Sequence, residues 1–190
     1  MARPIEYDRD QVLEGVMKTF WEKGYEGTSI SDLVRATQLN TRTMYNVFGD
    51  KQGLYLAALK NYQNQHLQNG LALLKRKHGI AGVSDFLNAM TESEPINSCL
   101  FVNSLSEECG SIGDPCREYV QNYFGLLEQQ IKKNLKEAKE DGEFAGNATV
   151  AAQAVVCLLQ GMCLSKLHPS TEERRRMVRY VLRTIIIGSG

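Results

Sequence analysis

The chain has 190 residues, of which 43% are hydrophobic and only four are proline, and its 22 Lys and Arg residues balance 22 Asp and Glu residues. This composition excludes a long disordered chain, and the length allows one larger domain or a small domain fused to a medium one. The neutral charge excludes nucleic-acid binding through overall basicity, so any such contact needs locally placed charges.

No segment predicts export or insertion into a membrane. The N-terminal residues MARPIEYDRD are charged, and the longest nearly apolar stretch, 151–164, is too short to cross a bilayer. We therefore expect a cytoplasmic protein with no membrane partner. Its five cysteines show no Cys-x-x-Cys spacing and lie at no zinc-site spacing from the three histidines, so we expect free thiols, no metal and no cofactor.

Apolar residues recur at helical spacing nearly everywhere and never alternate for long, which predicts an all-α protein. The first helix should cover about residues 8–23, with Gly24 as its C-terminal stop. Ser29 to Asp32 has the form of a capping box and opens a short second helix that ends near Thr37.

A third short helix should follow Asn40, which is a suitable N-cap. Met44, Val47 and Phe48 have the spacing of a buried face. The side chains left to face outward are Thr41, Arg42, Thr43, Tyr45 and Asn46. Two short helices joined by a tight turn, the second with a polar outer face, predict a helix-turn-helix.

Longer helices are expected from residue 51 onward. Their approximate ranges are 51–76, 82–92, 99–108, 114–141, 147–167 and 171–187, with breaks at glycines and at Pro95 and Pro169. About nine helices result in total. We expect a DNA-binding domain over 1–50 and an effector-binding and dimerisation domain over 51–190.

The outward face of the third helix has the chemistry of a major-groove reader. Arg42 can bind guanine, Asn46 can bind adenine, and threonine methyl groups can contact thymine. Tyr45 and Lys51 suit phosphate contacts, and Arg3 in the N-terminal arm can reach the backbone or the minor groove. The alternative is an ordinary polar face of an α-helical bundle.

This region resembles the tetracycline-repressor (TetR) family of bacterial transcriptional regulators. The resemblance rests on Gly24-Tyr25, on Thr28-Ser29-Ile30, on Asp32-Leu33 and above all on residues 43–54, TMYNVFGDKQGL. It implies base-facing side chains at Thr41, Arg42, Thr43 and Asn46, and phosphate-facing ones at Thr28, Tyr45 and Lys51. The chain departs from the family at Gln38, where a turn glycine is usual, and at Val47, where an aromatic residue or histidine is common.

The last two helices are the expected dimer interface. The helix at 147–167 is apolar on nearly all sides, which suggests burial against its own core and against a partner. The resemblance implies a homodimeric four-helix bundle, and an intramolecular hairpin is the alternative. The candidate interface residues are Val155, Leu158, Leu159, Val178, Val181, Leu182 and Ile185.

A small-molecule pocket is expected among the middle helices. Its candidate lining residues, which can equally be plain core, are Phe86, Met90, Phe101, Tyr119, Tyr123, Phe124 and Met162. Cys99 opens a short helix in a segment that resembles the Gly-Cys-Leu-x-x-Asn segment of a TetR subgroup that includes thiol-based sensors. A helix N-terminus favours a thiolate, so Cys99 is a candidate sensor, with Cys109 and Cys116 as possible resolving partners. Cys157 and Cys163 are interpreted as packing residues.

These observations predict a homodimeric transcriptional regulator, and not an enzyme. It should repress transcription from a palindromic operator until an effector binds the bundle. Three alternatives stay open: a redox or electrophile sensor that uses Cys99, a DNA-binding adaptor for another protein, and an α-helical thiol enzyme.

Overall fold

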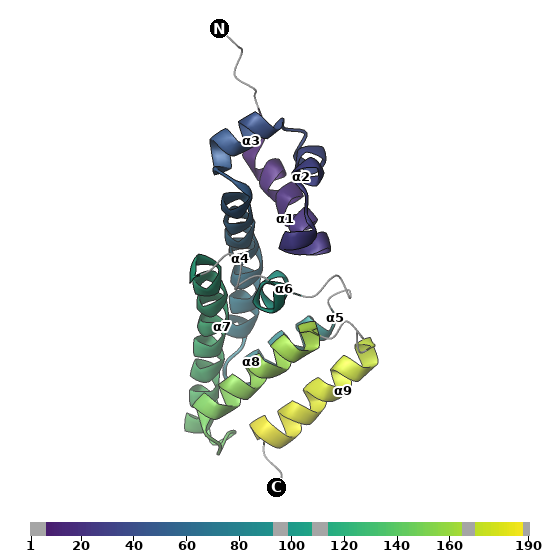
Figure 1. Ribbon diagram of the computed structural model, residues 1–190. Helices are drawn as coiled ribbons and strands as arrows, with labels where there is room; N and C mark the ends of the chain where they lie inside the picture. Colours follow the sequence, from purple (N-terminus) through teal and green to yellow (C-terminus); the bar gives the residue numbers. More distant parts are fainter. Residues whose placement is uncertain (1–6, 93–98, 108–113, 165–169, 188–190) are drawn as a thin grey trace.

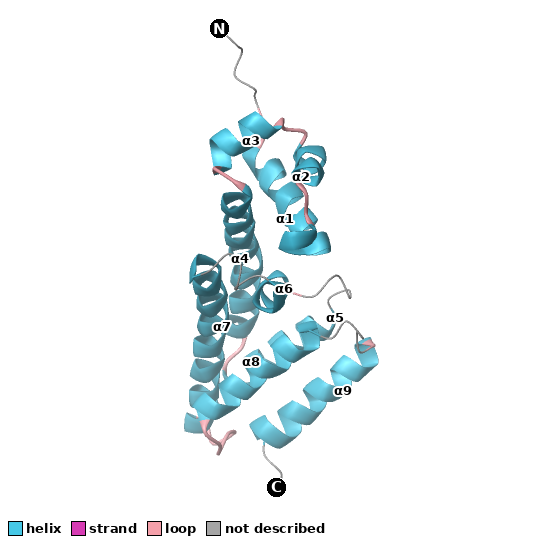
Figure 2. Ribbon diagram, in the orientation of Figure 1, coloured by secondary structure: helices cyan, strands magenta, loops and turns pink. Residues whose placement is uncertain are grey.

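The computed structural model describes residues 7–92, 99–107, 114–164 and 170–187. Within these ranges every regular element is helical and no strand occurs (Figure 2), so the predicted all-α class is confirmed. The helices are α1 (Arg9–Gly27), α2 (Ile30–Thr37), α3 (Thr41–Phe48), α4 (Lys51–Arg76), α5 (Gly79–Glu92), α6 (Leu100–Glu107), α7 (Asp114–Glu140), α8 (Ala148–Leu164) and α9 (Thr171–Val181), which continues as a π-helical segment, Leu182–Ile187.

Most predicted helix bounds agree with the structure to within one or two residues. The largest differences inside the described ranges are at α1, which ends at Gly27, four residues later than expected, and at α5, which begins three residues earlier than expected. Gly79 opens this helix with a φ of 57°, a backbone conformation that glycine adopts without strain. The expected breaks at Pro95, Gly110, Gly113 and Pro169 lie outside the described residues.

Helices α1, α2 and α3 form one end of the molecule, which we call the head (Figure 1). The carboxylate of Asp8 caps α1 by accepting from the backbone N–H of Asp10 at 2.9 Å. Val16 and Phe20, which belong to α1, are fully buried on the inner side of this helix. Gly24 has a φ of 72° and breaks the helical path, as the sequence predicted, although one more helical turn follows.

Helix α2 is held against α1 by a capping box and an ion pair. The hydroxyl of Ser29 accepts from the Asp32 N–H, and the Asp32 carboxylate accepts from the Ser29 N–H. Lys23 Nζ on α1 lies 2.6 Å from the same carboxylate. The bonds from Lys23 and Ser29 hold the pKa of Asp32 well below its usual value.

Helix α4 connects the head with the rest of the chain. It packs against α1 near its start and against α7 and α5 farther along. Tyr55 is buried, and its hydroxyl lies 2.7 Å from the hydroxyl of Ser104 on α6. Any shift of α4 therefore displaces contacts in both parts of the molecule.

Helix α7 is the centre of the remaining bundle, where it contacts α4, α5 and α8. Asn134 on α7 is buried, and its amide nitrogen donates to the carbonyl oxygens of Leu74 at 2.8 Å, Lys77 at 3.3 Å and Gly79 at 3.4 Å. One side chain thus satisfies the backbone at the junction between α4 and α5.

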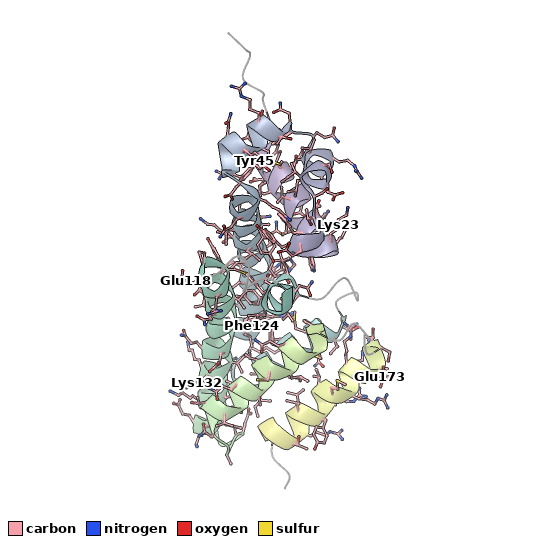
Figure 3. All side chains as sticks on the ribbon, viewed as in Figure 1. Lys23, Tyr45, Glu118, Phe124, Lys132 and Glu173 are labelled. Atoms are coloured by element: carbon pink, nitrogen blue, oxygen red, sulfur yellow. The ribbon has the colours of Figure 1, made fainter. Side chains whose placement is uncertain are left out.

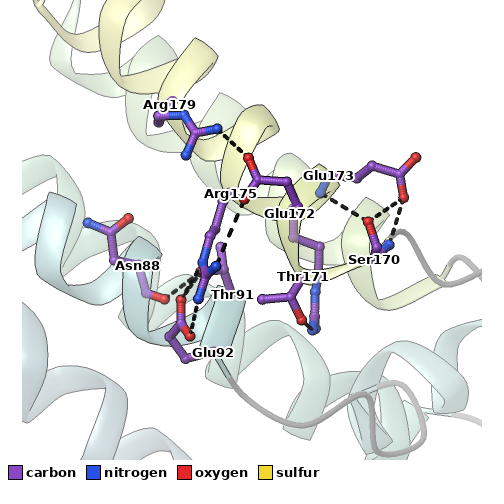
Figure 4. A network of polar contacts seen from close by, with 10 residues as sticks. Asn88, Thr91, Glu92, Ser170, Thr171, Glu172, Glu173, Arg175 and Arg179 are labelled. Carbon is purple, nitrogen blue, oxygen red and sulfur yellow. Dashed lines mark hydrogen bonds and ion pairs between the residues drawn. The ribbon is translucent and has the colours of Figure 1, made fainter.

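Helix α9 packs on α5 and reaches it through polar contacts as well (Figure 4). The guanidinium of Arg175 donates two hydrogen bonds to Glu92 at 2.7 and 2.8 Å. Ser170 caps the start of α9 in a capping box with Glu173. Among the described residues, none of the helices is both long enough and apolar enough to span a membrane.

Candidate functional site

Helix α3 is anchored on one side and open on the other. Met44 is completely buried in the head, and Asn40 caps the helix by accepting from the Thr43 N–H at 2.9 Å. Thr41, Arg42 and Asn46 are exposed, while Thr43 and Tyr45 are half-buried. The side chains predicted to face outward thus share one open surface at the tip of the molecule, where Figure 3 labels Tyr45.

Two predictions about this surface need correction. Val47, expected on the buried face, is 38% exposed, because α3 is held mainly by Met44 and turns Val47 toward solvent. Thr28, expected to face phosphate, is only 1% exposed, and its hydroxyl donates to the Gly24 carbonyl at 2.6 Å. Thr28 therefore closes the end of α1 in this structure. Arg3 lies outside the described residues.

Lys51 opens α4 directly beside α3. Its ammonium group lies 4.4 Å from the centroid of the Tyr25 ring, a cation–π contact that sets the direction of the side chain. Asp50 caps α4 by accepting from the Gly53 N–H at 2.7 Å. The first turn of α4 thus combines a lysine with the positive end of a helix dipole, an arrangement that suits an anion.

The turn between α2 and α3 contains the single non-glycine residue of the described chain with a positive φ, Gln38, at 59°. A left-handed conformation costs an ordinary residue roughly 1–2 kcal/mol. The Gln38 side chain recovers part of this cost, since its amide donates to the Arg35 carbonyl at 3.0 Å. The departure from glycine noted in the sequence is therefore accommodated with strain.

Replacing Gln38 with glycine should stabilise the protein. We expect a gain of about 0.5–1 kcal/mol in the free energy of unfolding, because relief of the strain exceeds the lost hydrogen bond and the added entropy of the unfolded chain. Urea denaturation of the wild type and of Gln38→Gly measures it. Gln38→Ala, which keeps the strain and loses the bond, is the matched control and should be less stable than the wild type.

An aromatic cluster joins the head to the bundle. Trp21 on α1 meets Tyr62 on α4 edge-on at 5.2 Å, and His66 stacks on Tyr62 at 4.1 Å. Phe101 on α6 lies 5.3 Å from Tyr62 and 4.7 Å from Tyr123 on α7. Burial lowers the pKa of His66, because it disfavours the charged form of the ring.

Three of the predicted pocket residues, Phe101, Tyr123 and Phe124, belong to or adjoin this cluster. Phe86 is fully buried, and Met90, Tyr119 and Met162 are partly buried against the core. Sequence reasoning missed Tyr62, His66 and Trp21. Tyr62 and His66 are four residues apart on α4, and this spacing was the available signal for one aromatic surface.

The thiols are arranged differently from the prediction. Cys99 precedes α6 and accepts a hydrogen bond from the Tyr62 hydroxyl at 3.4 Å. Its thiol also donates a hydrogen bond to the sulfur of Cys163 on α8. This hydrogen bond, together with burial, raises the pKa of Cys99. Cys116, proposed as a resolving partner, is fully buried on α7, and Cys109 lies outside the described residues.

Cys163, expected to be a packing residue, is thus the thiol beside Cys99. The thiol and the backbone N–H of Cys99 both donate hydrogen bonds to the sulfur of Cys163. Together with the charge of Arg174, these hydrogen bonds lower the pKa of Cys163 to about 7. The prediction of a low pKa at Cys99 was wrong, because the polarity of this contact favours the thiolate on the other sulfur.

Five of the seven residues predicted for the dimer interface are buried within the protomer. Val155 and Val178 are completely buried within the protomer, and Leu159, Val181 and Leu182 are nearly so. Leu158 is half-buried, and the side chain of Ile185 lies outside the described set. Since α8 is apolar on almost every side, its pattern could not show which face meets its own core.

Apolar side chains nevertheless lie exposed on both helices. Val150 and Cys157 on α8 are exposed, as are Met177 and Tyr180 on α9, the last with 68% of its surface accessible. Each pair has helical spacing, seven residues on α8 and three on α9. We call these four residues the α8–α9 face.

Comparisons with known proteins agree with this geometry. The model of the family described as "Bacterial regulatory proteins, tetR family" matches residues 12–58, which reach from α1 into α4. The HTH-type transcriptional repressor ComR of Escherichia coli (strain K12) is 29% identical over 184 residues, covering 91% of this chain and 86% of ComR. The uncharacterized HTH-type transcriptional regulator YezE of Bacillus subtilis (strain 168) is 29% identical over 157 residues, covering 78% and 79%.

Solved structures show the same fold along nearly the whole chain. The TetR family transcriptional regulator CifR, as a cysteine mutant complexed with 26 bp double-strand operator DNA, matches with a TM-score of 0.83 and 25% identity, over 96% of this chain and 99% of CifR. The reduced form of E. coli NemR matches with a TM-score of 0.81 and 20% identity, over 96% and 98%.

Proposed function

This chain belongs to the TetR family of bacterial regulatory proteins and is a transcriptional regulator, and from that premise we propose that it is a homodimeric repressor that an effector releases from its operator. The family consists of regulators and not of enzymes, which removes the thiol-enzyme alternative. The observation that carries the proposal is the open α3 surface, held in place by the buried Met44.

On this surface, the exposed side chains of Arg42 and Asn46 are suited to base edges in the major groove. Tyr45 and Lys51 border the surface where a phosphate backbone would pass. The head has no excess of basic residues, with seven Lys and Arg against eight Asp and Glu in residues 1–51. Affinity for DNA must therefore come from a few well-placed contacts in each head and from the binding of two heads to the same duplex.

Two heads require a dimer, and the α8–α9 face is our candidate interface. Exposed apolar side chains on these two helices gain stability when a second copy covers them. A twofold pairing would give a palindromic operator with half-sites about 10 base pairs, or a multiple of that, apart. CifR was captured on 26 bp of operator DNA, a length that holds two such half-sites.

For the effector, we propose the region around Phe101 and Tyr123, where α6 and α7 meet the Tyr62 side of α4. The same tyrosine contacts Trp21 in the head. An effector that displaced Phe101 or Tyr123 would therefore move α1 relative to α4 and change the separation of the two heads. A coupling free energy of about 1–3 kcal/mol changes operator affinity roughly 5–150-fold, which is enough for a switch.

Selection from random duplex DNA tests the proposal. The wild type should enrich a palindromic site, and Arg42→Ala should lose about 1–3 kcal/mol of affinity together with discrimination at one position in each half-site. The matched control is Arg76→Ala, an exposed arginine at the far end of α4, which should bind like the wild type. Failure to enrich any sequence at low salt would refute the function.

Placing charges on the α8–α9 face should dissociate the dimer. We expect Met177→Asp combined with Tyr180→Asp to sediment as a folded monomer and to lose more than about 100-fold in operator affinity, because only one head then contacts the DNA. Leu105→Asp is the control, since Leu105 is 45% exposed on α6, away from this face. A double variant that stays dimeric would exclude the face as the interface.

A further inference from the structure

Cys99 and Cys163 are 64 positions apart in the chain, yet their thiols are in hydrogen-bond contact between the start of α6 and the end of α8. Both cysteines are free and half-buried. A disulfide forms only between cysteines that their backbones already bring close. The fold therefore meets the first requirement for a disulfide at this position.

The surroundings give the two sulfur atoms different chemistry. The Tyr62 hydroxyl donates to Cys99 at 3.4 Å, and the Cys99 thiol bonds to Cys163. Arg174 on α9 places its charge near Cys163. Its Nη2 donates to Thr171 at 3.2 Å, while its buried Nε has no hydrogen-bond partner among the residues described. The positive charge of Arg174 thus acts on a thiol that is half-buried.

These neighbours make Cys163 the more nucleophilic of the pair. Its pKa of about 7 leaves a large fraction as thiolate near neutral pH, whereas the raised pKa of Cys99 keeps that thiol protonated. A thiolate next to a second thiol is the arrangement in which a sulfenic acid is converted to a disulfide.

We propose that Cys163 is a thiol that reacts with hydroperoxides, and that Cys99 resolves the product into a disulfide joining α6 to α8. The Cys163 thiolate attacks the peroxide, the O–O bond breaks, and the leaving alkoxide takes a proton from water to become an alcohol. Cys163 is then a sulfenic acid. The sulfur of Cys99 attacks it, the S–S bond forms, and hydroxide leaves with the thiol proton as water. Two thiols have lost two electrons, and the peroxide has gained them.

The disulfide would act on the head through contacts already described. An S–S bond of about 2.05 Å is shorter than any contact between two separate sulfur atoms, so the side chains of Cys99 and Cys163, or the backbone that carries them, must move closer together. Helix α6 packs against α1, and Phe101 on α6 contacts Tyr62, which contacts Trp21 on α1. A change in DNA binding on oxidation would follow from these contacts, and it rests on the proposed function. Formation of the disulfide does not.

The experiment treats the reduced full-length protein, without DNA, with tert-butyl hydroperoxide and maps disulfides by mass spectrometry of non-reduced peptides. We expect Cys99 joined to Cys163 as the main product. Cys163→Ser should slow peroxide consumption at least about tenfold. Cys99→Ser should keep the consumption but stop at a sulfenic acid that dimedone traps on Cys163. Cys109→Ser, a cysteine without a role in this proposal, is the control and should behave like the wild type.

Circular dichroism checks that each variant is folded, and the pH dependence of Cys163 alkylation in the wild type gives a second measurement, with a midpoint expected near 7. A main disulfide to Cys109 or Cys116, or wild-type peroxide consumption by Cys163→Ser, would overturn the inference. The same samples are tested on the selected duplex. Disulfide formation in a protein that binds no site refutes only the proposed function, and specific binding with no Cys99–Cys163 disulfide refutes only this inference.

Discussion

Replacing Gly53 with alanine should abolish operator binding and leave the bundle folded. Gly53 lies in the first turn of α4, and a Cβ atom there would fall far inside van der Waals contact with the Phe48 carbonyl oxygen at the end of α3. Backbone atoms cannot move aside as a side chain can, so α3 must shift relative to α4. We expect a loss of about 2–3 kcal/mol in head stability and at least about 100-fold in operator affinity.

The measurement is fluorescence anisotropy with the selected duplex, together with thermal unfolding. The matched control is Gly125→Ala on α7, where an added Cβ meets nothing within 4 Å. That change should leave binding intact and can stabilise the helix by up to about 1 kcal/mol. Wild-type affinity for Gly53→Ala would show that the α3–α4 junction does not set the position of the reading surface.

Asn134→Leu should be the most destabilising change in the bundle. It removes the donor shared by the carbonyls of Leu74, Lys77 and Gly79, and it leaves these groups at the α4–α5 junction without that partner. We expect a loss of about 2–4 kcal/mol, which lowers the melting temperature by roughly 5–15 °C for a domain of this size.

Differential scanning calorimetry measures this loss. Gln130→Ala serves as the control because it removes only the neighbouring bond to the Asn134 carbonyl oxygen, at 2.9 Å, and should cost less than about 1 kcal/mol. If Asn134→Leu had the same melting temperature as Gln130→Ala, the three carbonyl groups would be accepting hydrogen bonds from other donors. Asn134 would then not be the residue that secures the α4–α5 junction.

Much of the head could be predicted because its signals are local. Ser29, Asn40 and Gly24 each mark a helix end through their own side chain or backbone freedom, and the structure has a cap or a break at each one. The outward residues of α3 follow from the position of Met44. Thr28 could not be predicted in the same way, since its hydroxyl turns inward to the carbonyl of Gly24, and an exposed or an inward rotamer suits the same sequence.

In the bundle the deciding contacts are between residues distant in the chain. The face of α8 that is buried depends on α7 and α6, and an apolar pattern on nearly all sides carries no information about it. Cys163 was misjudged for the same reason, because its partner lies 64 positions earlier and no spacing connects the two residues. The aromatic cluster likewise combines side chains from α1, α4, α6 and α7.

Hydroxyl-radical footprinting of the selected duplex is the most direct test of a dimeric reader that covers two half-sites. A dimer bound to a palindromic site should give two symmetric protected regions, with centres about 10 base pairs or a multiple of that apart. Arg42→Ala should weaken both regions equally, and Arg76→Ala should change neither. A single unrepeated region, or protection that survives Arg42→Ala unchanged, would contradict a dimer that reads DNA through α3.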